Sequence, residues 1–219
     1  MRIVTVPGVF QPRSDARLLA ATMRERGLAS GARVLDVFTG SGVLALVAAR
    51  EGAREVVAVD VSRRALVCVR INARRNGVAD RVHARRGDLL APVAGERFDL
   101  ILANPPYVPS PGDALPQRGA ARAWEGGGDG RALLDRLCAA APAALAPGGT
   151  LLLVQSSVCD ERATLQRLSD AGLQSERLAA RRGPLGPLMR ERAGLLRARG
   201  LLAGGQDEEL LVLAARAPR

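Results

Sequence analysis

The chain contains no lysine and only one histidine, His83, among its 219 residues. A single histidine makes a zinc site or a His-based catalytic triad implausible, and we expect no metal site. The three cysteines, Cys68, Cys138 and Cys159, lie far apart and are expected to be small buried hydrophobes in a reducing cytoplasm. No run approaches the ~18 apolar residues of a membrane span, and the N-terminus lacks a signal-peptide core. We therefore expect a cytoplasmic protein without membrane contact.

Aromatic residues are also scarce, with one Trp, one Tyr and three Phe, although the net charge is +10. A charge of this size suggests nucleic acid as a partner. However, all 32 basic residues are arginine, which a compositional bias of the source explains equally well. Enzymes that act on nucleic acids also tend to stack bases on aromatic side chains. Nucleic acid is therefore our second choice of substrate.

The pattern of strands and helices predicts one α/β domain over residues 1–219, with residues 1–30 forming an arm and a capping helix and 31–219 the core. We expect a Rossmann-like, seven-stranded, mostly parallel sheet with helices on both faces. The strands are expected near residues 33–38, 55–60, 81–86, 98–103, 150–154, 174–180 and 209–215, the last two forming an antiparallel edge pair. Ser14 or Asp15 is expected to cap the first helix. Residues 181–207 are the least interpretable segment.

The stretch that organises the chain is Asn104-Pro105-Pro106-Tyr107, which follows the apolar run 98–103. Two prolines end the strand and fix the asparagine at the carboxyl edge of the sheet, where open α/β folds bind ligands. The side-chain oxygen of Asn104 and the carbonyl of Pro105 are neighbouring acceptors that suit an NH2 group. Tyr107 can cover the flat face of that group.

Three acids accompany three successive strands: Asp36, Asp60 and Asp88. Asp36 precedes the glycine loop 39–42, where it suits the ammonium of an amino-acid moiety better than a pyrophosphate. Asp60 ends the second strand, where a carboxylate can accept hydrogen bonds from ribose hydroxyls. Asp88 can accept from an exocyclic adenine amine, with Leu89 beside the ring. The loop also fits the dinucleotide pattern Gly-x-Gly-x-x-Gly/Ala, which alone is a weak signal.

Together these stretches resemble class I S-adenosylmethionine-dependent methyltransferases, and closely the HemK/PrmC protein-glutamine methyltransferases. The similarity rests on residues 34–42, 59–60, 87–88 and 98–107, and on the glycine-rich loop 124–131. It implies S-adenosyl-L-methionine as cofactor and catalytic roles for Asn104, Pro105, Pro106 and Tyr107. The implied cofactor-binding residues are Asp36, Phe38, Thr39, Gly40, Ser41, Gly42, Asp60, Val61, Asp88, Leu89 and Asn104.

The resemblance further implies N5-methylation of a glutamine in the Gly-Gly-Gln loop of a release factor. The alternatives are an adenine N6 or guanine N2 methyltransferase, a non-catalytic cofactor-binding subunit and, least favoured, a nicotinamide oxidoreductase. The helical N-terminal domain of bacterial PrmC is missing, as in the short archaeal and eukaryotic branch, some of whose members work with a small activating partner. Ala16 stands where that branch has a hydroxyl residue. The chain's own Gly204-Gly205-Gln206 is expected to be a turn, with self-methylation as the alternative.

Overall fold

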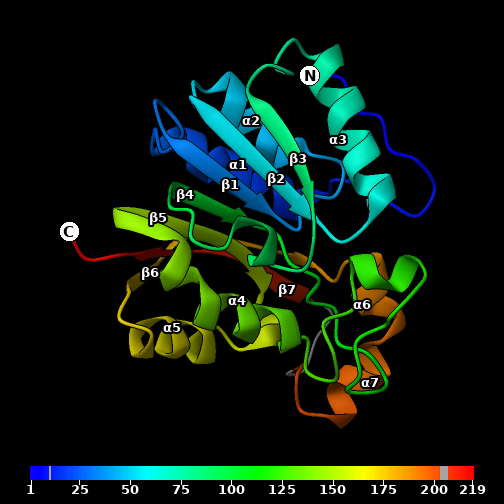
Figure 1. Cartoon of the computed structure of the whole chain (residues 1–219). Coiled ribbons are helices and arrows are strands. Elements are labelled where there is room, and N and C mark those ends of the chain that lie inside the picture. The colour runs from blue at the N-terminus through cyan, green and yellow to red at the C-terminus, as the bar shows by residue number, and fades with distance from the viewer. Residues whose placement is uncertain (10, 203–206) are drawn as a thin grey trace.

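The computed structural model describes residues 1–9, 11–202 and 207–219, so Gly204-Gly205-Gln206 lies outside the described residues. Seven strands form one sheet in the order β3-β2-β1-β4-β5-β7-β6 (Figure 1). Their bounds are β1 Arg33–Val37, β2 Glu55–Asp60, β3 Val82–Arg86, β4 Phe98–Ala103, β5 Leu145–Ser156, β6 Gln174–Pro184 and β7 Asp207–Arg216. β1 to β5 pair in parallel, whereas β7 is antiparallel to both β5 and β6. The expected topology is confirmed.

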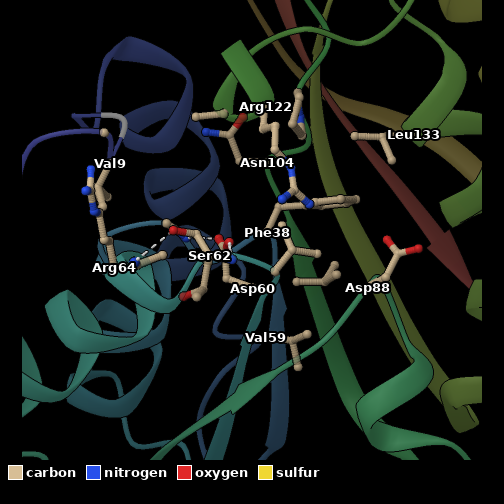
Figure 2. A pocket seen from close by; sticks show the side chains of 18 of the residues that line it. Val9, Phe38, Val59, Asp60, Ser62, Arg64, Asp88, Asn104, Arg122 and Leu133 are labelled. Atoms are coloured by element: carbon tan, nitrogen blue, oxygen red, sulfur yellow. Dashed lines mark hydrogen bonds between the residues drawn. The ribbon is translucent and has the colours of Figure 1, made fainter. Parts of the chain in front are cut away.

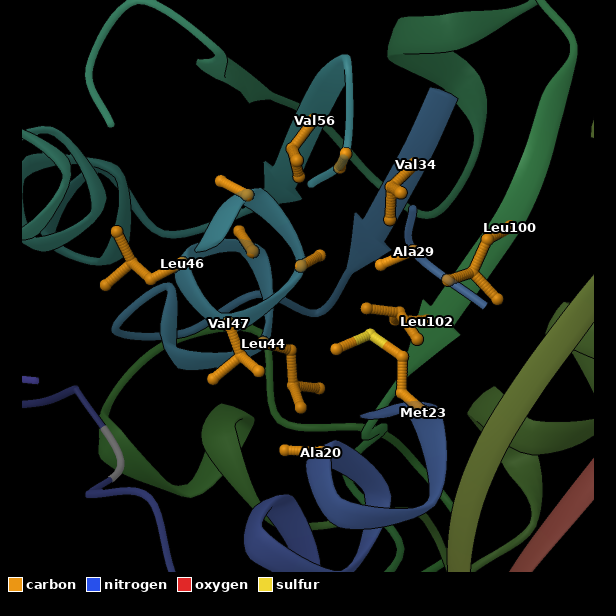
Figure 3. Packing of buried hydrophobic residues seen from close by; sticks show 14 of the residues in the cluster. Ala20, Met23, Ala29, Val34, Leu44, Leu46, Val47, Val56, Leu100 and Leu102 are labelled. Atoms are coloured by element: carbon orange, nitrogen blue, oxygen red, sulfur yellow. The ribbon is translucent and has the colours of Figure 1, made fainter. Parts of the chain in front are cut away.

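The central strands are buried on both faces because α-helices cover both sides of the sheet. The helices are α1 Ser14–Glu25, α2 Val43–Arg50, α3 Arg63–Arg75, α4 Ala132–Ala144, α5 Glu161–Asp170, α6 Pro187–Glu191 and α7 Ala193–Ala198. α1, α2 and α3 pack on one face, where Met23 and Leu44 meet Leu102 of β4 (Figure 3). α4 and α5 cover the other face through side chains such as Leu134 and Leu168. Within the described part of the chain, no helix has the length and apolarity to cross a bilayer.

Helix caps show where local sequence rules hold and where tertiary contacts override them. Ser62 caps α3 in agreement with the local preference for serine at this position, because its hydroxyl accepts a hydrogen bond from the Ala65 amide. The prediction that Ser14 or Asp15 caps α1 is wrong: the capping residue is Arg13, without a side-chain cap bond. The Asp15 carboxylate instead accepts from the Tyr107 hydroxyl, so a tertiary contact has replaced the local cap.

The segment that the sequence left uninterpreted contains the extended end of β6, followed by α6 and α7. These two short helices contribute Met189 and Leu196 to a separate apolar cluster, in which they meet Val108 and Val158. Val108 opens the long loop that follows Asn104-Pro105-Pro106-Tyr107. The α6–α7 segment is therefore packed against the loop that leaves the candidate site (Figure 1).

Candidate active site

A cleft of about 970 Å³ opens where β1, β2, β3 and β4 end (Figure 2). All four strands are parallel, so the segments that follow them meet at one edge of the sheet. Ten of the residues expected at the site line this cleft: Phe38, Thr39, Gly40, Ser41, Asp60, Val61, Asp88, Leu89, Asn104 and Pro106. Asp36, Gly42, Pro105 and Tyr107 are not among the described residues that line it.

Asp60 ends β2 and is held rigidly by backbone amides. One carboxylate oxygen accepts from the Gly40 amide at 2.9 Å, and the other accepts from the Ser62 amide at 2.8 Å. Burial raises the pKa of this carboxyl, while the two amide hydrogen bonds and the charge of Arg122 oppose the rise. Because each oxygen can accept a second hydrogen bond, the fixed carboxylate can still receive two hydroxyl groups of a ligand in the cleft.

Asp36 lies beneath the glycine loop and is completely buried. One carboxylate oxygen accepts from the Thr39 hydroxyl at 2.6 Å and from the Ala45 amide at the start of α2 at 3.0 Å. The other oxygen has no hydrogen-bond partner among the described residues. Burial raises the pKa of Asp36 to about 7, so the carboxyl is poised between its neutral and ionised forms near neutral pH. An unpartnered buried oxygen is costly unless a ligand or proton satisfies it.

Two cleft residues adopt backbone conformations that side chains other than glycine rarely take. Phe38 has φ of 62° and Leu89 has φ of 50°. Strain of this kind concentrates at functional sites, where the surrounding structure holds it in place. In the view of Figure 2, Phe38 lies between Asp60 and Asp88. Asp88 forms an ion pair with Arg136 of α4 at 2.6 Å, and both side chains are about half exposed.

Asn104 and Pro105 provide two acceptors that no described residue uses. Asn104 follows β4, its side chain lines the cleft (Figure 2), and no described residue forms a hydrogen bond with its amide group. Likewise, among the described residues, none donates to the carbonyl of Pro105, although this proline is buried. A buried acceptor without a partner is rare in a folded protein. The Asn104 amide therefore faces the cleft without a protein partner, and the carbonyl of Pro105, its neighbour in sequence, is also unused by the described residues.

By contrast, the five carbonyls of residues 107–111 all accept hydrogen bonds. The Cys159 thiol donates to the first at 3.2 Å, and the Gly126 amide donates to the second at 3.0 Å. Arg192, which also pairs with Glu125, donates to the third at 2.7 Å. Arg199 donates to the fourth at 2.8 Å and to the fifth at 2.6 Å, and also reaches the carbonyl of Gly128. Hydrogen bonds and an ion pair thus fix the long loop at its start, residues 107–111, and near its end, at residues 125–128.

Tyr107 is anchored to α1. Its hydroxyl donates to Asp15 of α1 at 3.1 Å, and burial together with that nearby carboxylate raises its pKa well above the ordinary value. The hydroxyl therefore stays protonated at neutral pH. Gly126 and Gly130 press against the backbone here, since a Cβ on Gly126 would lie 2.8 Å from the Pro106 carbonyl oxygen. This close approach explains why the loop 126–130 needs glycine.

The N-terminal arm is fastened to α3 by two asparagines that the sequence did not single out. Asn72 accepts from the Val4 amide and donates to the Val4 carbonyl, both at 2.8 Å, and Asn76 pairs with Arg2 in the same way. Asn72 and Asn76 are four residues apart, a helical rise of about 6 Å, and Arg2 and Val4 are two residues apart, an extended span of about 6.6 Å. The spacing of the two asparagines therefore matches that of the two arm residues. Asn72 also donates to the Ser41 carbonyl at 2.9 Å, which joins the arm to the glycine loop.

Other residues of the cleft come from segments in which the sequence predicted no site residue. Gly8, Val9 and Pro12 of the arm line the cleft, as do residues 115–120, 122 and 123 of the long loop. Arg63 and Arg64 at the start of α3 also contribute. Only the length of the loop signalled that it would take part.

The strand order, the antiparallel β7 and the glycine loop beside two acids define a class I methyltransferase. Comparison with known proteins gives the family. Residues 1–115 match the family described as "Methyltransferase small domain". A protein of Methanocaldococcus jannaschii with the provisional name protein N5-glutamine methyltransferase is 33% identical over 183 residues, which cover 84% of this chain and 90% of the relative. The chain therefore belongs to the S-adenosylmethionine-dependent N-methyltransferases of this family, related to the HemK/PrmC protein-glutamine methyltransferases.

Two bacterial relatives match over shorter stretches. The release factor glutamine methyltransferase of Moorella thermoacetica is 39% identical over 153 residues, 67% of this chain and 54% of the relative. The ribosomal protein uL3 glutamine methyltransferase of Bradyrhizobium diazoefficiens is 44% identical over 125 residues, 55% of this chain and 39% of the relative. The matched region thus spans about half or less of these bacterial proteins.

A solved structure shares the fold over nearly the whole chain. The Mtq2–Trm112 complex of E. cuniculi, described as responsible for methylation of the eRF1 termination factor, aligns with a TM-score of 0.66 and 23% identity. The alignment covers 96% of this chain and 99% of that one. At this identity the similarity establishes the fold alone.

The cleft fits S-adenosylmethionine, the cofactor of this family. Its volume of about 970 Å³ lies within the range of small-molecule sites. Phe38, Val59 and Leu89 give it apolar surface for a flat ring, and Asp60 offers a fixed carboxylate beside that surface. The unpartnered oxygen of Asp36 adds a buried acceptor beneath the loop.

Proposed function

We propose that this protein methylates the side-chain nitrogen of the glutamine in a Gly-Gly-Gln loop of a peptide chain release factor. The observation that carries the proposal is that neither the Asn104 amide, which lines the cleft, nor the neighbouring Pro105 carbonyl has a hydrogen-bond partner among the described residues. A primary amide has two N–H donors on one planar nitrogen, and two adjacent acceptors can hold both. A hydroxyl or thiol would leave one acceptor unsatisfied. Family membership and the release factor relatives agree with this choice.

The proposed contribution of the protein is orientation. The bound cofactor supplies an electrophilic methyl group on sulfur. Asn104 and Pro105 hold the two amide protons, which fixes the direction of the nitrogen lone pair and stabilises positive charge that develops on nitrogen. Both acceptors are themselves neutral amides, so the proton displaced from nitrogen leaves to solvent. Tyr107, which does not line the cleft, helps to fix the backbone of this segment through its hydrogen bond to Asp15.

A glycine-flanked glutamine suits this site because Asn104 lines a cleft that is bordered by the long loop. Neighbouring residues without side chains can follow the glutamine inward without clashing. In the solved complex the methyltransferase Mtq2 is bound to Trm112. We extend the proposal to a small activating partner subunit, for which copurification from native extract and mass determination of the complex provide the test.

The substrate test offers labelled cofactor with four acceptors: a release factor, its Gln→Ala variant at Gly-Gly-Gln, ribosomal protein uL3 and total RNA. Label on the unmodified factor alone is the expected result. Label on uL3 or on RNA at comparable efficiency, or on the Gln→Ala factor, would overturn the release factor assignment. Label on the enzyme that disappears in the Gln206→Ala variant would instead indicate self-methylation.

The chemical test is Asn104→Ala. Losing one orienting acceptor should lower turnover by roughly two orders of magnitude, judged from the loss of comparable groups in other enzymes. Binding of S-adenosylhomocysteine should change little. A variant that lost cofactor affinity but kept its turnover at saturation would show that Asn104 serves the cofactor, not the substrate. Failure of any acceptor to become labelled, with cofactor binding intact, would favour a non-catalytic cofactor-binding subunit.

A further inference from the structure

The net charge of the chain is concentrated in one part of the sequence. Residues 63–86 contain eight arginines and one acid, a net charge of +7 against +10 for the whole chain. A compositional bias explains why the basic residues are arginine. It does not explain why one helix and one strand lack balancing acids. These residues form α3 and the edge strand β3, which lie together at one side of the molecule (Figure 1).

A second arginine-rich stretch shows what balanced arginines look like. Residues 177–199 contain seven arginines and one acid, but Arg177, Arg182 and Arg192 pair with acids from other segments. Arg199 donates to carbonyls of the long loop. Three of the seven arginines of that stretch thus have an acidic partner, against two of the eight in residues 63–86.

In the 63–86 stretch, six arginines form no ion pair with another described residue, and we call them the arginine face: Arg63, Arg64, Arg70, Arg74, Arg75 and Arg86. All six are exposed. Three of them, Arg64, Arg70 and Arg86, donate to backbone carbonyls, which leaves their charge uncompensated. Uncompensated like charges repel one another and gain from a polyanionic partner.

The arginine face begins at the active-site cleft and extends along α3. Arg63, Arg64 and Arg86 line the mouth of the cofactor cleft. Arg74 and Arg75 lie at the other end of α3, about 18 Å away by helical rise. The outer stripe of the helix is therefore a track of positive charge that begins at the cleft and runs away from it.

We propose that the arginine face binds RNA through its phosphate backbone, with the strand lying along α3. The guanidinium group matches phosphate bidentately, and a row of arginines can follow a row of phosphates. The near absence of aromatic residues on the track predicts binding without sequence preference, since base stacking would be missing.

Two other occupants fit the observations less well. A protein partner would require an apolar interface core, and the exposed stripe of α3 offers only Val67 and Ile71 between its arginines. A membrane surface would require an apolar helix face free to enter the lipid. The apolar face of α3, including Leu66 and Val69, is instead buried in the protein core.

The test uses the full chain and a fluorescein-labelled oligouridylate of about 20 nucleotides, a length suited to the site sizes of single-strand binders. Arg70→Gln, Arg74→Gln and Arg75→Gln are combined in one variant, because these three residues lie outside the cleft. The matched control combines Arg26→Gln, Arg162→Gln and Arg181→Gln, which removes the same charge from exposed positions elsewhere. Anisotropy is measured against salt for both variants and for the unmodified chain.

Losing three phosphate contacts should lower the slope of log K against log salt by about 2 and weaken binding at 0.1 M salt by roughly tenfold to a hundredfold. The control should keep the slope of the unmodified chain. Equal losses in the two variants would overturn the proposal, because binding would then follow net charge alone. Polyglutamate or phosphatidylglycerol vesicles that bind as tightly as the RNA would also overturn it, in favour of an acidic protein or a membrane. Binding is measured directly, so the result does not depend on the methylation substrate.

Discussion

Asp36 gives the most quantitative prediction, because its surroundings make protein stability depend on pH. Burial raises its folded-state pKa to about 7, whereas an unfolded aspartate titrates near 3.9. Between these values the folded protein holds a proton that the unfolded chain has lost. Folding therefore takes up a proton in this window, and the contribution of Asp36 to stability declines as pH rises from about 4 to 7. The full decline is on the order of 4 kcal/mol.

The perturbation is Asp36→Asn, which mimics the neutral acid and can still accept from Thr39 and Ala45. Between pH 5 and 7.5, the unfolding free energy of the unmodified chain should fall relative to the variant by about 3 kcal/mol, since about two pH units of the window are crossed. Urea unfolding at several pH values measures this difference, with Asp170→Asn as an exposed control. Parallel pH profiles for the unmodified chain and Asp36→Asn would refute the reasoning.

The same carboxyl should link cofactor binding to a proton. An ammonium group beside Asp36 favours the ionised form, so binding of S-adenosylhomocysteine near pH 6 should release up to one proton. Calorimetry in buffers of different ionisation enthalpy measures this release. The Asp36→Asn variant should release none, and equal release by both proteins would show that Asp36 does not face the ammonium.

Three further predictions concern the supports of the site. Asp60→Ala should weaken S-adenosylhomocysteine binding about ten- to a hundredfold, from lost hydrogen bonds worth roughly 1.5–3 kcal/mol; unchanged affinity by calorimetry would reject the ribose assignment. Arg199→Gln should loosen the loop and lower kcat roughly tenfold while cofactor affinity stays unchanged. The control is Arg190→Gln, which should keep the kcat of the unmodified chain because Arg190 donates to Leu185 in its own segment. Asn72→Ala should expose the arm to proteolysis and cost about 1–3 kcal/mol of stability; an equally protected arm would contradict the proposed latch.

The sequence predicted the parts of the fold that depend on local pattern. The apolar run 98–103 and the two prolines after it place β4 and its end without tertiary information. The positions of the glycine loop and of Asp60 could be predicted for the same reason, because each lies where an apolar strand ends and a turn begins. All ten cleft-lining residues named in advance come from segments that directly follow a strand.

The remaining parts depend on contacts between residues far apart in the chain. Asn72 looks like a polar break in the buried face of α3 and Asn76 like an ordinary C-cap, so local rules do not predict their contacts with the arm, 68 to 74 residues away. Arg199 reaches the loop across 88 and 89 residues. Asp15 was expected to cap a helix because local rules cannot anticipate the Tyr107 hydroxyl. α6 and α7 have five and six residues, too short for a helical period to stand out.

In the proposed mechanism, the hydrogen bonds around the site prepare the backbone beside Asn104 and Pro105 for the substrate. The carbonyls of residues 107–111 are all occupied, and the loop they form is clamped by Arg192 and Arg199. The backbone beside Asn104 is therefore already ordered in the folded protein, so its conformational entropy is lost on folding and not on substrate binding. A substrate amide that enters the cleft meets acceptors that need not reorganise, and preorganised dipoles act more strongly than mobile ones. Loosening the clamp should therefore lower turnover although Asn104 and Pro105 themselves are unchanged.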